Sequence, residues 1–317
     1  MSGYCHSLWK EIESSFDEKL FFGNKQLLEV ILTAFLVRGH VLVEGPPGTG
    51  KTLVAKLFAH KLSRSFKRIQ FTSDLLPGDI LGSHVYSPAD SSFRFVPGPI
   101  FADIVLADEI NRTPPRTQSA LLEAMEERQV TIEGERMSLS SSFFVIATQN
   151  PIEMEGTFPL PEAHVDRFLF RVKVSHADRA VEQRMLEAFV KGELPPRLDA
   201  VHPMSCSFEE VDREISSVEV HAVLLDYVAE ILERTRSSQM LAHGSSIRGG
   251  MALIKSARVR ALFEGRRFVI PDDIKFFSQI TLPHRVRPST EAQVSRINDE
   301  QIIADIVRQV PVPVKIT

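Results

Sequence analysis

The sequence contains little cysteine. Only two cysteines occur among 317 residues, Cys5 and Cys206, and they lie far apart in the chain. A disulfide framework needs several cysteines, and a structural zinc site needs four ligands at short spacings, so the composition argues against both. His202 precedes Cys206 by four residues, but two candidate ligands are too few for such a site. We interpret both cysteines as incidental.

Long apolar runs and a basic excess are also missing. No stretch approaches the ~18 apolar residues that cross a bilayer, and the first six residues lack the basic and apolar regions of a secretory signal. We therefore expect a cytoplasmic protein without membrane insertion. The formal net charge is −4 and the pI is near 6.2. Because no surplus positive charge is available to neutralise phosphates, nucleic-acid binding is not expected.

The remaining composition is that of an ordinary globular protein, with 43% hydrophobic and 25% charged residues. The first half alternates helical and strand patterns, which predicts a parallel sheet with helices on both faces. A buried helix is expected over 24–38 and an edge strand over 168–174, where apolar and basic residues alternate. The expected buried strands are 41–43, 104–107 and 143–147.

The domain organisation follows from where these patterns change. Two turn-rich segments, about 84–97 and 129–140, predict hairpins inserted into the α/β part. Prolines and polar residues then cluster over the linker 192–210, and only helical patterns follow. The predicted fold is therefore an α/β P-loop sandwich with a central parallel sheet over 1–191, followed by a small all-helical domain with a C-terminal tail over 211–317.

A glycine-rich segment carries the strongest chemical signal. It fits G-x-x-x-x-G-K-[ST] between a predicted strand and a predicted helix. The residues are Gly45, Pro46, Pro47, Gly48, Thr49, Gly50, Lys51 and Thr52, with Leu53 completing the predicted nucleotide-binding set. Backbone N–H groups of such a loop surround phosphates, Lys51 is expected to reach the β- and γ-phosphates of ATP, and Thr52 is expected to bind Mg²⁺. The alternative is an ordinary Gly/Pro turn, which the flanking strand and helix argue against.

Two carboxylates directly follow the buried strand 104–107. The carboxyl ends of parallel strands face the ligand crevice of such a sheet. Asp108 suits Mg²⁺, usually through water, and Glu109 suits a general base that polarises the attacking water. Alone such a pair often only caps a helix, but after a P-loop it predicts an ATP-hydrolysing site.

Five further polar residues are candidates on weaker local grounds. Asn150 follows the strand expected beside that of Asp108, where an amide could orient water or contact the γ-phosphate; an Asn-Pro turn is the alternative. The arginine fork is fixed and permanently charged, which suits γ-phosphate contacts. The candidates of this type are Arg112, Arg116, Arg167 and Arg248. Most arginines only solvate a surface, and the sequence does not decide which of the first three acts on a neighbouring subunit.

In this order, the motifs resemble the AAA+ ATPases, and more narrowly the MoxR family of the helix-2-insert clade. Besides the P-loop, the likeness rests on segments 74–82, 95–102, 107–112, 118–127 and 147–168. They include Ala-Asp-Glu-Ile-Asn-Arg from residue 107 and Ala-Thr-Gln-Asn-Pro from residue 147. The likeness covers most of residues 20–290 and is most specific across 40–170.

The resemblance implies roles that spacing does not show. Asn150 matches sensor 1, Arg167 the arginine finger that acts on ATP in the adjacent subunit, and Arg248 sensor 2 on the lid. Gly23 and Asn24 fall at a contact with the nucleotide base. The family further implies a homo-oligomeric, usually hexameric, ring that remodels other proteins, often with a partner that has a metal-binding von Willebrand factor A domain.

Three functions fit these observations. The first is an ATPase that drives chaperone-like remodelling or metal-insertion maturation of a partner. The second is a nucleotide-gated scaffold with slow turnover, which Glu109 argues against because a pure switch needs no water-activating carboxylate. The third is a DNA-acting motor of the same superfamily, which the acidic balance argues against. Stimulation of the ATPase by a partner separates the first two, and salt-sensitive DNA binding would indicate the third.

Overall fold

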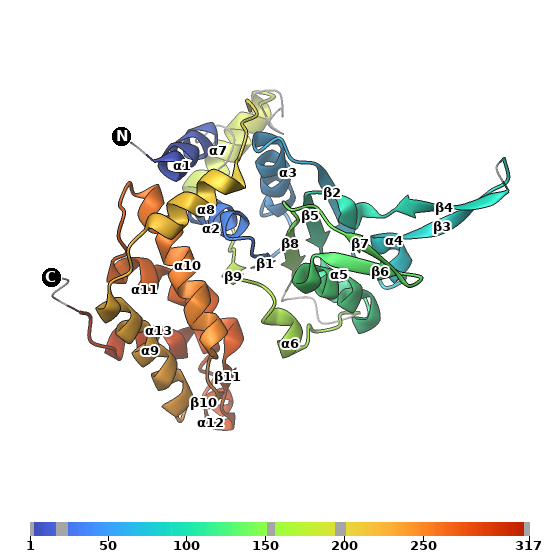
Figure 1. Ribbon diagram of the computed structural model, residues 1–317. Coiled ribbons are helices and arrows are strands. Elements are labelled where there is room, and N and C mark those ends of the chain that lie inside the picture. Colours follow the sequence, from blue (N-terminus) through green and yellow to red (C-terminus); the bar gives the residue numbers. More distant parts are fainter. Residues whose placement is uncertain (1–2, 17–24, 90, 151–155, 194–200, 314–317) are drawn as a thin grey trace.

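The computed structural model describes residues 3–16, 25–89, 91–150, 156–193 and 201–313. Its centre is a five-stranded parallel sheet in the order β2-β5-β8-β1-β9 (Figure 1). The strands are β1 (Val41–Glu44), β2 (Phe66–Gln70), β5 (Ile104–Asp108), β8 (Phe144–Gln149) and β9 (Phe170–Lys173). The three predicted buried strands are confirmed, and β9 lies at the sheet edge as predicted.

The central strands β1, β5 and β8 are buried on both faces and are mostly apolar, whereas the edge strands β2 and β9 also carry exposed polar residues. Val41 and Val43 of β1 pack in one apolar cluster with α2 (Lys25–Leu36) and α3 (Lys51–Lys61). Leu42 packs in a second cluster with α4 (Pro77–Leu81) and α5 (Pro115–Glu127). Because successive strand side chains point to opposite faces, β1, β5 and β8 each contribute to both clusters.

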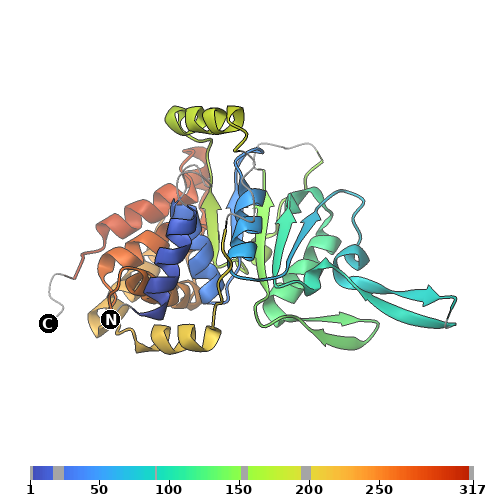
Figure 2. The same ribbon diagram turned by 90° about the horizontal axis from the view of Figure 1, so that it is seen from above.

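Both predicted hairpins are present and project from the same side of the body (Figure 2). They are β3 (Gly82–Ser87) with β4 (Ser92–Pro97), and β6 (Gln129–Ile132) with β7 (Glu135–Ser138). Phe93 is 71% exposed near the tip of the first hairpin, whereas the Phe95 ring packs against His84 and Phe101. Packing therefore accounts for Phe95 but not for Phe93.

The second half is helical, as predicted. Helix α7 (Arg179–Val190) precedes the predicted linker, and the helices that follow it are α8 (Phe208–Ser217), α9 (Ala222–Ser237), α10 (Ile247–Phe263), α11 (Pro271–Thr281), α12 (Thr290–Val294) and α13 (Asp299–Gln309). The second half also contains a small antiparallel sheet of β10 (Leu241–His243) and β11 (Arg287–Pro288). Strands of two or three residues are too short to show an alternating pattern, so they are not predicted from the sequence.

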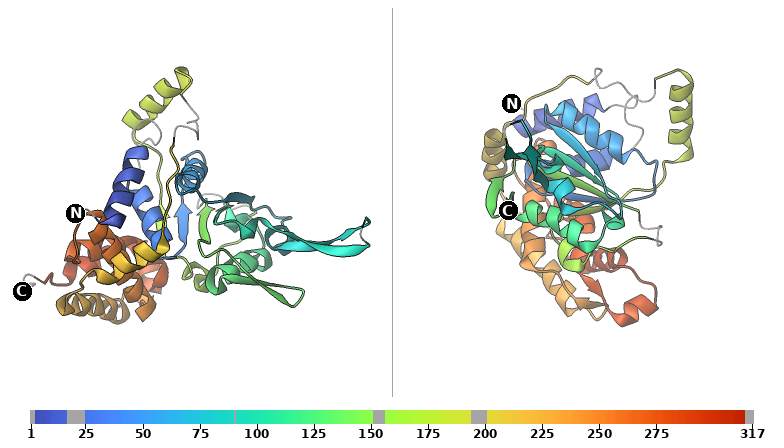
Figure 3. Two further views of the ribbon diagram at one scale, coloured as in Figure 1. Left: turned by 45° about the horizontal axis from the view of Figure 1, so that its top comes forward. Right: turned by 90° about the vertical axis from the view of Figure 1, so that its right-hand side faces the viewer.

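The N-terminal helix α1 (Tyr4–Ser15) lies against α8 and α10 (Figures 1 and 3). The Trp9 ring stacks on Phe263 at 5.1 Å between centroids, and the Tyr4 N–H donates to the Glu214 carboxylate at 2.7 Å. The predicted boundaries place residues 1–191 together. These contacts pack α1 on the C-terminal helices, and the ion pair between Glu11 and Lys61 of α3 joins it to the α/β part as well. The apolar face of one helix cannot reveal such partners on its own.

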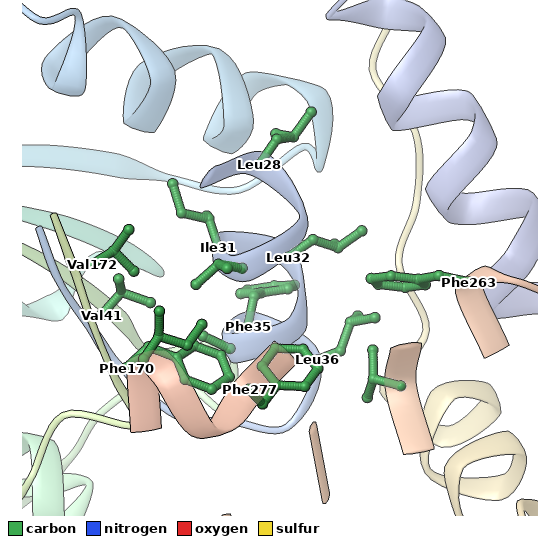
Figure 4. Close-up of a cluster of buried hydrophobic side chains, with 14 of the residues drawn as sticks. Leu28, Ile31, Leu32, Phe35, Leu36, Val41, Phe170, Val172, Phe263 and Phe277 are labelled. Atoms are coloured by element: carbon green, nitrogen blue, oxygen red, sulfur yellow. The ribbon is translucent and has the colours of Figure 1, made fainter. Parts of the chain in front are cut away.

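The α/β part and the helical part share one apolar cluster. Phe35 of α2 lies within it, and Phe170 of β9 stacks on Phe277 of α11 at 5.2 Å between centroids (Figure 4). The helical part is therefore packed on the β9 edge of the sheet. Over the described ranges, no helix combines the length and apolarity needed to cross a membrane.

Candidate functional site

The loop between β1 and α3 has a backbone that needs glycine. Gly48 and Gly50 have φ of 81° and 78°, in the left-handed region. A Cβ at Gly45 would meet the Val174 carbonyl oxygen at 2.4 Å. The loop thus turns tightly out of the sheet and enters α3 at Lys51. Its N–H groups and the positive end of that helix are available for an anion.

Lys51 is folded back over this loop. Its Nζ donates to the carbonyl oxygens of Gly45 and Pro46, at 2.9 and 2.6 Å, and to Thr49 Oγ1 at 3.1 Å. Burial lowers the pKa of Lys51, and the charges of Asp108 and Glu109 oppose that shift. The ammonium group therefore lies inside the loop, partly desolvated and near both carboxylates.

Asp108, at the end of β5, is held on both carboxylate oxygens. Oδ1 accepts from Thr148 Oγ1 at 2.6 Å, and Oδ2 accepts from Arg68 Nε and Nη2 at 3.0 and 2.7 Å. Thr148 Oγ1 also accepts from the Glu109 N–H at 2.9 Å. Thr148 on β8 and Arg68 on β2 thus fix the carboxylate from the two neighbouring strands.

Glu109 has a left-handed backbone, with φ of 57°. Such a conformation is uncommon for a residue with a side chain, and it directs the chain sharply away from β5. The Glu109 carboxylate accepts from Gln70 Nε2 at 2.7 Å and pairs with Arg112 Nε at 3.4 Å. Gln70 lies directly opposite Asp108 in the β2–β5 register, so β2 holds both carboxylates.

These residues line a cavity of about 430 Å³ at the carboxyl ends of the strands. Its walls bring together the predicted residues Gly45, Pro47, Gly48, Thr49, Gly50, Lys51, Thr52, Leu53, Asp108, Glu109 and Asn150. Pro46 contributes only its carbonyl, to Lys51. The cavity also includes Arg68, Gln70, Thr148 and Gln149, which the sequence did not predict. Gly23 and Asn24 lie outside the described residues.

The predicted arginines lie elsewhere. Arg167 Nη2 pairs with Glu126 of α5 at 3.2 Å, and Arg248 Nη1 lies 3.9 Å from Asp166. Neither contributes to the walls of the cavity. Arg112 contacts Glu109 of its own chain, and Arg116 is exposed on α5.

The donor set fits a nucleoside triphosphate with Mg²⁺. Positive φ at Gly48 and Gly50 leaves the loop open, with nothing within 4 Å of a Cβ at either position, so phosphate oxygens can approach the backbone. No cluster of three or more His, Cys, Asp or Glu residues that could hold a metal occurs in the described part of the chain. Mg²⁺ usually takes one or two protein ligands together with phosphate oxygens and water, which matches Thr52 and Asp108.

The fold and the site define a P-loop ATPase of the AAA+ type, and comparison with known proteins agrees. The "ATPase family associated with various cellular activities (AAA)" matches residues 40–170, and the AAA lid domain matches residues 233–306. A solved structure from Cytophaga hutchinsonii superimposes with a TM-score of 0.86 at 34% identity, over 98% of this chain and 97% of that one.

Two curated relatives show to which family of AAA+ ATPases the chain belongs. The chain is 39% identical to the chaperone MoxR1 of Mycobacterium tuberculosis, over 93% of this chain and 80% of the relative. It is 28% identical to the protein MoxR of Methylorubrum extorquens, over 95% and 94% of the two chains. The chain belongs to the MoxR family of AAA+ ATPases, with an α/β P-loop core and a helical lid.

Proposed function

We propose that the chain hydrolyses Mg·ATP at interfaces between subunits of a homo-oligomeric, hexameric ring. The observation that carries this proposal is the position of the arginines. The loop, both carboxylates and Asn150 line one cavity, while Arg167 is held on another surface by Glu126. Arg68, which lines the cavity, is bound to Asp108, so the transition-state arginine can be supplied by a neighbour.

Each residue then has a distinct role. Lys51 leaves the carbonyls of Gly45 and Pro46 for phosphate oxygens, and Thr52 and Asp108 hold Mg²⁺. Bound Mg²⁺ supplies charge neutralisation on the phosphates. Asn150 orients the lytic water.

Glu109 removes a proton from that water, for which its carboxylate must exchange Gln70 for water. Arg167 of the neighbouring subunit offsets the negative charge on the γ-phosphate. Arg248 of the lid contacts the nucleotide of its own chain, and Gly23 and Asn24 contact the base.

The cellular role follows from the family. We propose chaperone-like remodelling, or metal-insertion maturation, of a partner with a von Willebrand factor A domain. The relative from Mycobacterium tuberculosis is named a chaperone, which supports the coarser part of this role. A cytoplasmic location and the lack of nucleic-acid binding remain predictions from composition and charge.

The test compares Arg167→Ala with Arg116→Ala, which removes an exposed arginine of α5. We expect Arg167→Ala to keep nucleotide affinity, measured with a fluorescent ATP analogue, and to lose turnover by ~10³-fold or more. Arg116→Ala should keep both. Loss of nucleotide binding in Arg167→Ala, or equal turnover in the two variants, would contradict the assignment in trans.

One observation favours the scaffold with slow turnover as a second candidate. Arg68 and Gln70 of β2 donate hydrogen bonds to the carboxylates of Asp108 and Glu109, which hydrolysis requires. The site is therefore in an inactive arrangement. Two results together would support the scaffold instead. A von Willebrand factor A domain protein would bind in a nucleotide-dependent way, and it would not stimulate the steady-state ATPase activity.

A further inference from the structure

The segment that carries Arg167 is held by the lid. Arg285 ends η4 (Pro283–Arg285), which follows α11. Its Nη2 donates to the Phe168 carbonyl at 2.8 Å, and its Nη1 donates to the Leu169 carbonyl at 3.1 Å. Its Nε pairs with Asp166 Oδ1 at 3.0 Å. One guanidinium therefore contacts the residues on both sides of Arg167.

His284 adds a second contact to the same segment. Its Nε2 lies 3.0 Å from the Phe168 carbonyl, so this nitrogen carries the proton and donates. Burial lowers the pKa of His284 well below its usual value, which keeps the ring neutral. The carbonyls of Phe168 and Leu169 are thus taken by lid donors, and β9 begins only at Phe170. These contacts account for a strand that begins at Phe170 and not at 168 as predicted.

These contacts are buried, which makes them costly to separate. The Arg285 side chain is 6% exposed, and burial lowers its pKa to about 10, so it stays charged at neutral pH. A buried charge that loses its partners is strongly unfavourable. The lid therefore fixes the backbone of segment 166–169, which the Leu169 N–H also joins to the His40 carbonyl of the α/β part at 2.8 Å.

Asp166 also faces a second lid arginine. Arg248 Nη1 on α10 lies 3.9 Å from Asp166 Oδ2, with its side chain 69% exposed. Arg248 is the lid residue proposed above to contact the nucleotide of its own chain. Asp166 thus stands between that arginine, Arg285 and the adjacent Arg167.

We propose that Asp166 and Arg285 are positioning residues for Arg167, and that they link the lid of one subunit to the ATP of the next. A lid movement on nucleotide binding in one subunit shifts Arg248 and Arg285 against Asp166, and through Asp166 it sets the position of Arg167 against the neighbouring γ-phosphate. This inference rests on the proposed function, in which Arg167 acts in trans.

The expected effect follows from the geometry. A misplacement of about 1 Å can cost ~10²-fold in rate. Asp166→Asn keeps the size of the side chain and removes the charge that faces both arginines. We therefore expect about a 10²-fold lower kcat in the adjacent site, without a change in its KM for ATP. Arg285→Ala leaves buried carbonyls without donors and can fail to fold, so Asp166→Asn is the better variant.

Mixed rings assign the effect to one subunit. An acceptor carrying Arg167→Ala binds ATP but offers no finger, whereas a donor carrying Glu109→Gln binds ATP and offers Arg167 but cannot activate water at its own site. Only an acceptor site next to a donor is then active. Asp166→Asn is placed on the donor in one experiment and on the acceptor in another. The matched control is Asp299→Asn, which weakens another ion pair between the lid and the sheet, to Arg171.

We expect Asp166→Asn to lower kcat only when the donor carries it, whereas Asp299→Asn acts alike in both places. A nitroxide attached at Arg167→Cys should become more mobile when Asp166→Asn is added, as read from its EPR line width. Equal losses in donor and acceptor, loss only in the acceptor, or unchanged nitroxide mobility would overturn the proposal. An inactive mixture of the parent donor and acceptor would instead overturn the trans assignment, and this inference with it.

Discussion

Arg68→Gln should tighten Mg²⁺ binding, because the guanidinium occupies Asp108, the carboxylate proposed to hold the ion. Arg68 donates twice to Asp108 Oδ2, with side-chain exposures of 48% for Arg68 and 12% for Asp108. Hydrogen bonds to charged groups contribute about 1.5–3 kcal/mol, and the exposure of Arg68 reduces this to about 1 kcal/mol. At ~1.4 kcal/mol per tenfold change, removing the competitor should lower the Mg²⁺ dissociation constant about fivefold.

The assay titrates Mg²⁺ into protein that holds a fluorescent ADP analogue and follows the midpoint. Lys67→Gln is the matched control, because it removes the same charge from the adjacent position on β2, whose side chain points to the other face. We expect the midpoint to fall for Arg68→Gln and to stay for Lys67→Gln. Equal shifts in both variants would mean that net charge, not this contact, controls Mg²⁺ affinity. Weaker binding in Arg68→Gln would refute the reasoning outright.

Two further predictions concern stability. Trp9, the only tryptophan, is 3% exposed and stacks on Phe263. Trp9→Ala should therefore lower the free energy of unfolding, measured by urea titration, by ~3–5 kcal/mol. A loss below ~1 kcal/mol would contradict the packing of α1 on α10. Burial lowers the pKa of His40 to about 3, and the unfolded chain therefore binds a proton first as the pH falls from about 6.5 towards 3. Protonation of the unfolded chain lowers the free energy of unfolding by about 2 kcal/mol at pH 5. His40→Gln should remove this loss. An equal pH dependence of the unfolding free energy in both proteins would refute the prediction.

The parts of the site that the sequence predicted are local in the chain. The P-loop sits between β1 and α3, and Asp108 and Glu109 end one apolar strand, so spacing alone brings out their chemistry. Arg68 and Gln70 were missed because β2 (Phe66–Gln70) is largely polar and resembles a surface segment. Arg68 and Gln70 are two residues apart, which indicates that they share one face of a strand near its end. Only the pairing of β2 with β5 shows which carboxylates they contact.

The same distinction applies to the fold. Apolar runs predicted the buried strands because both faces of the sheet are covered. The partners of α1, and the start of β9, depend on contacts between residues more than a hundred positions apart, such as Tyr4 with Glu214 and Arg285 with Phe168. Local patterns carry no information on such contacts. The predicted boundaries at 191 and 211 remain predictions.

The central claim is that the ATP site is complete only between subunits. Its most direct test is the specific ATPase activity of the native chain against protein concentration, with mass in solution followed by light scattering. The account predicts that specific activity is low where the mass is that of one 35.6 kDa chain and rises as the mass reaches that of the ring. Specific activity that is the same for the single chain and for the assembled protein would contradict it.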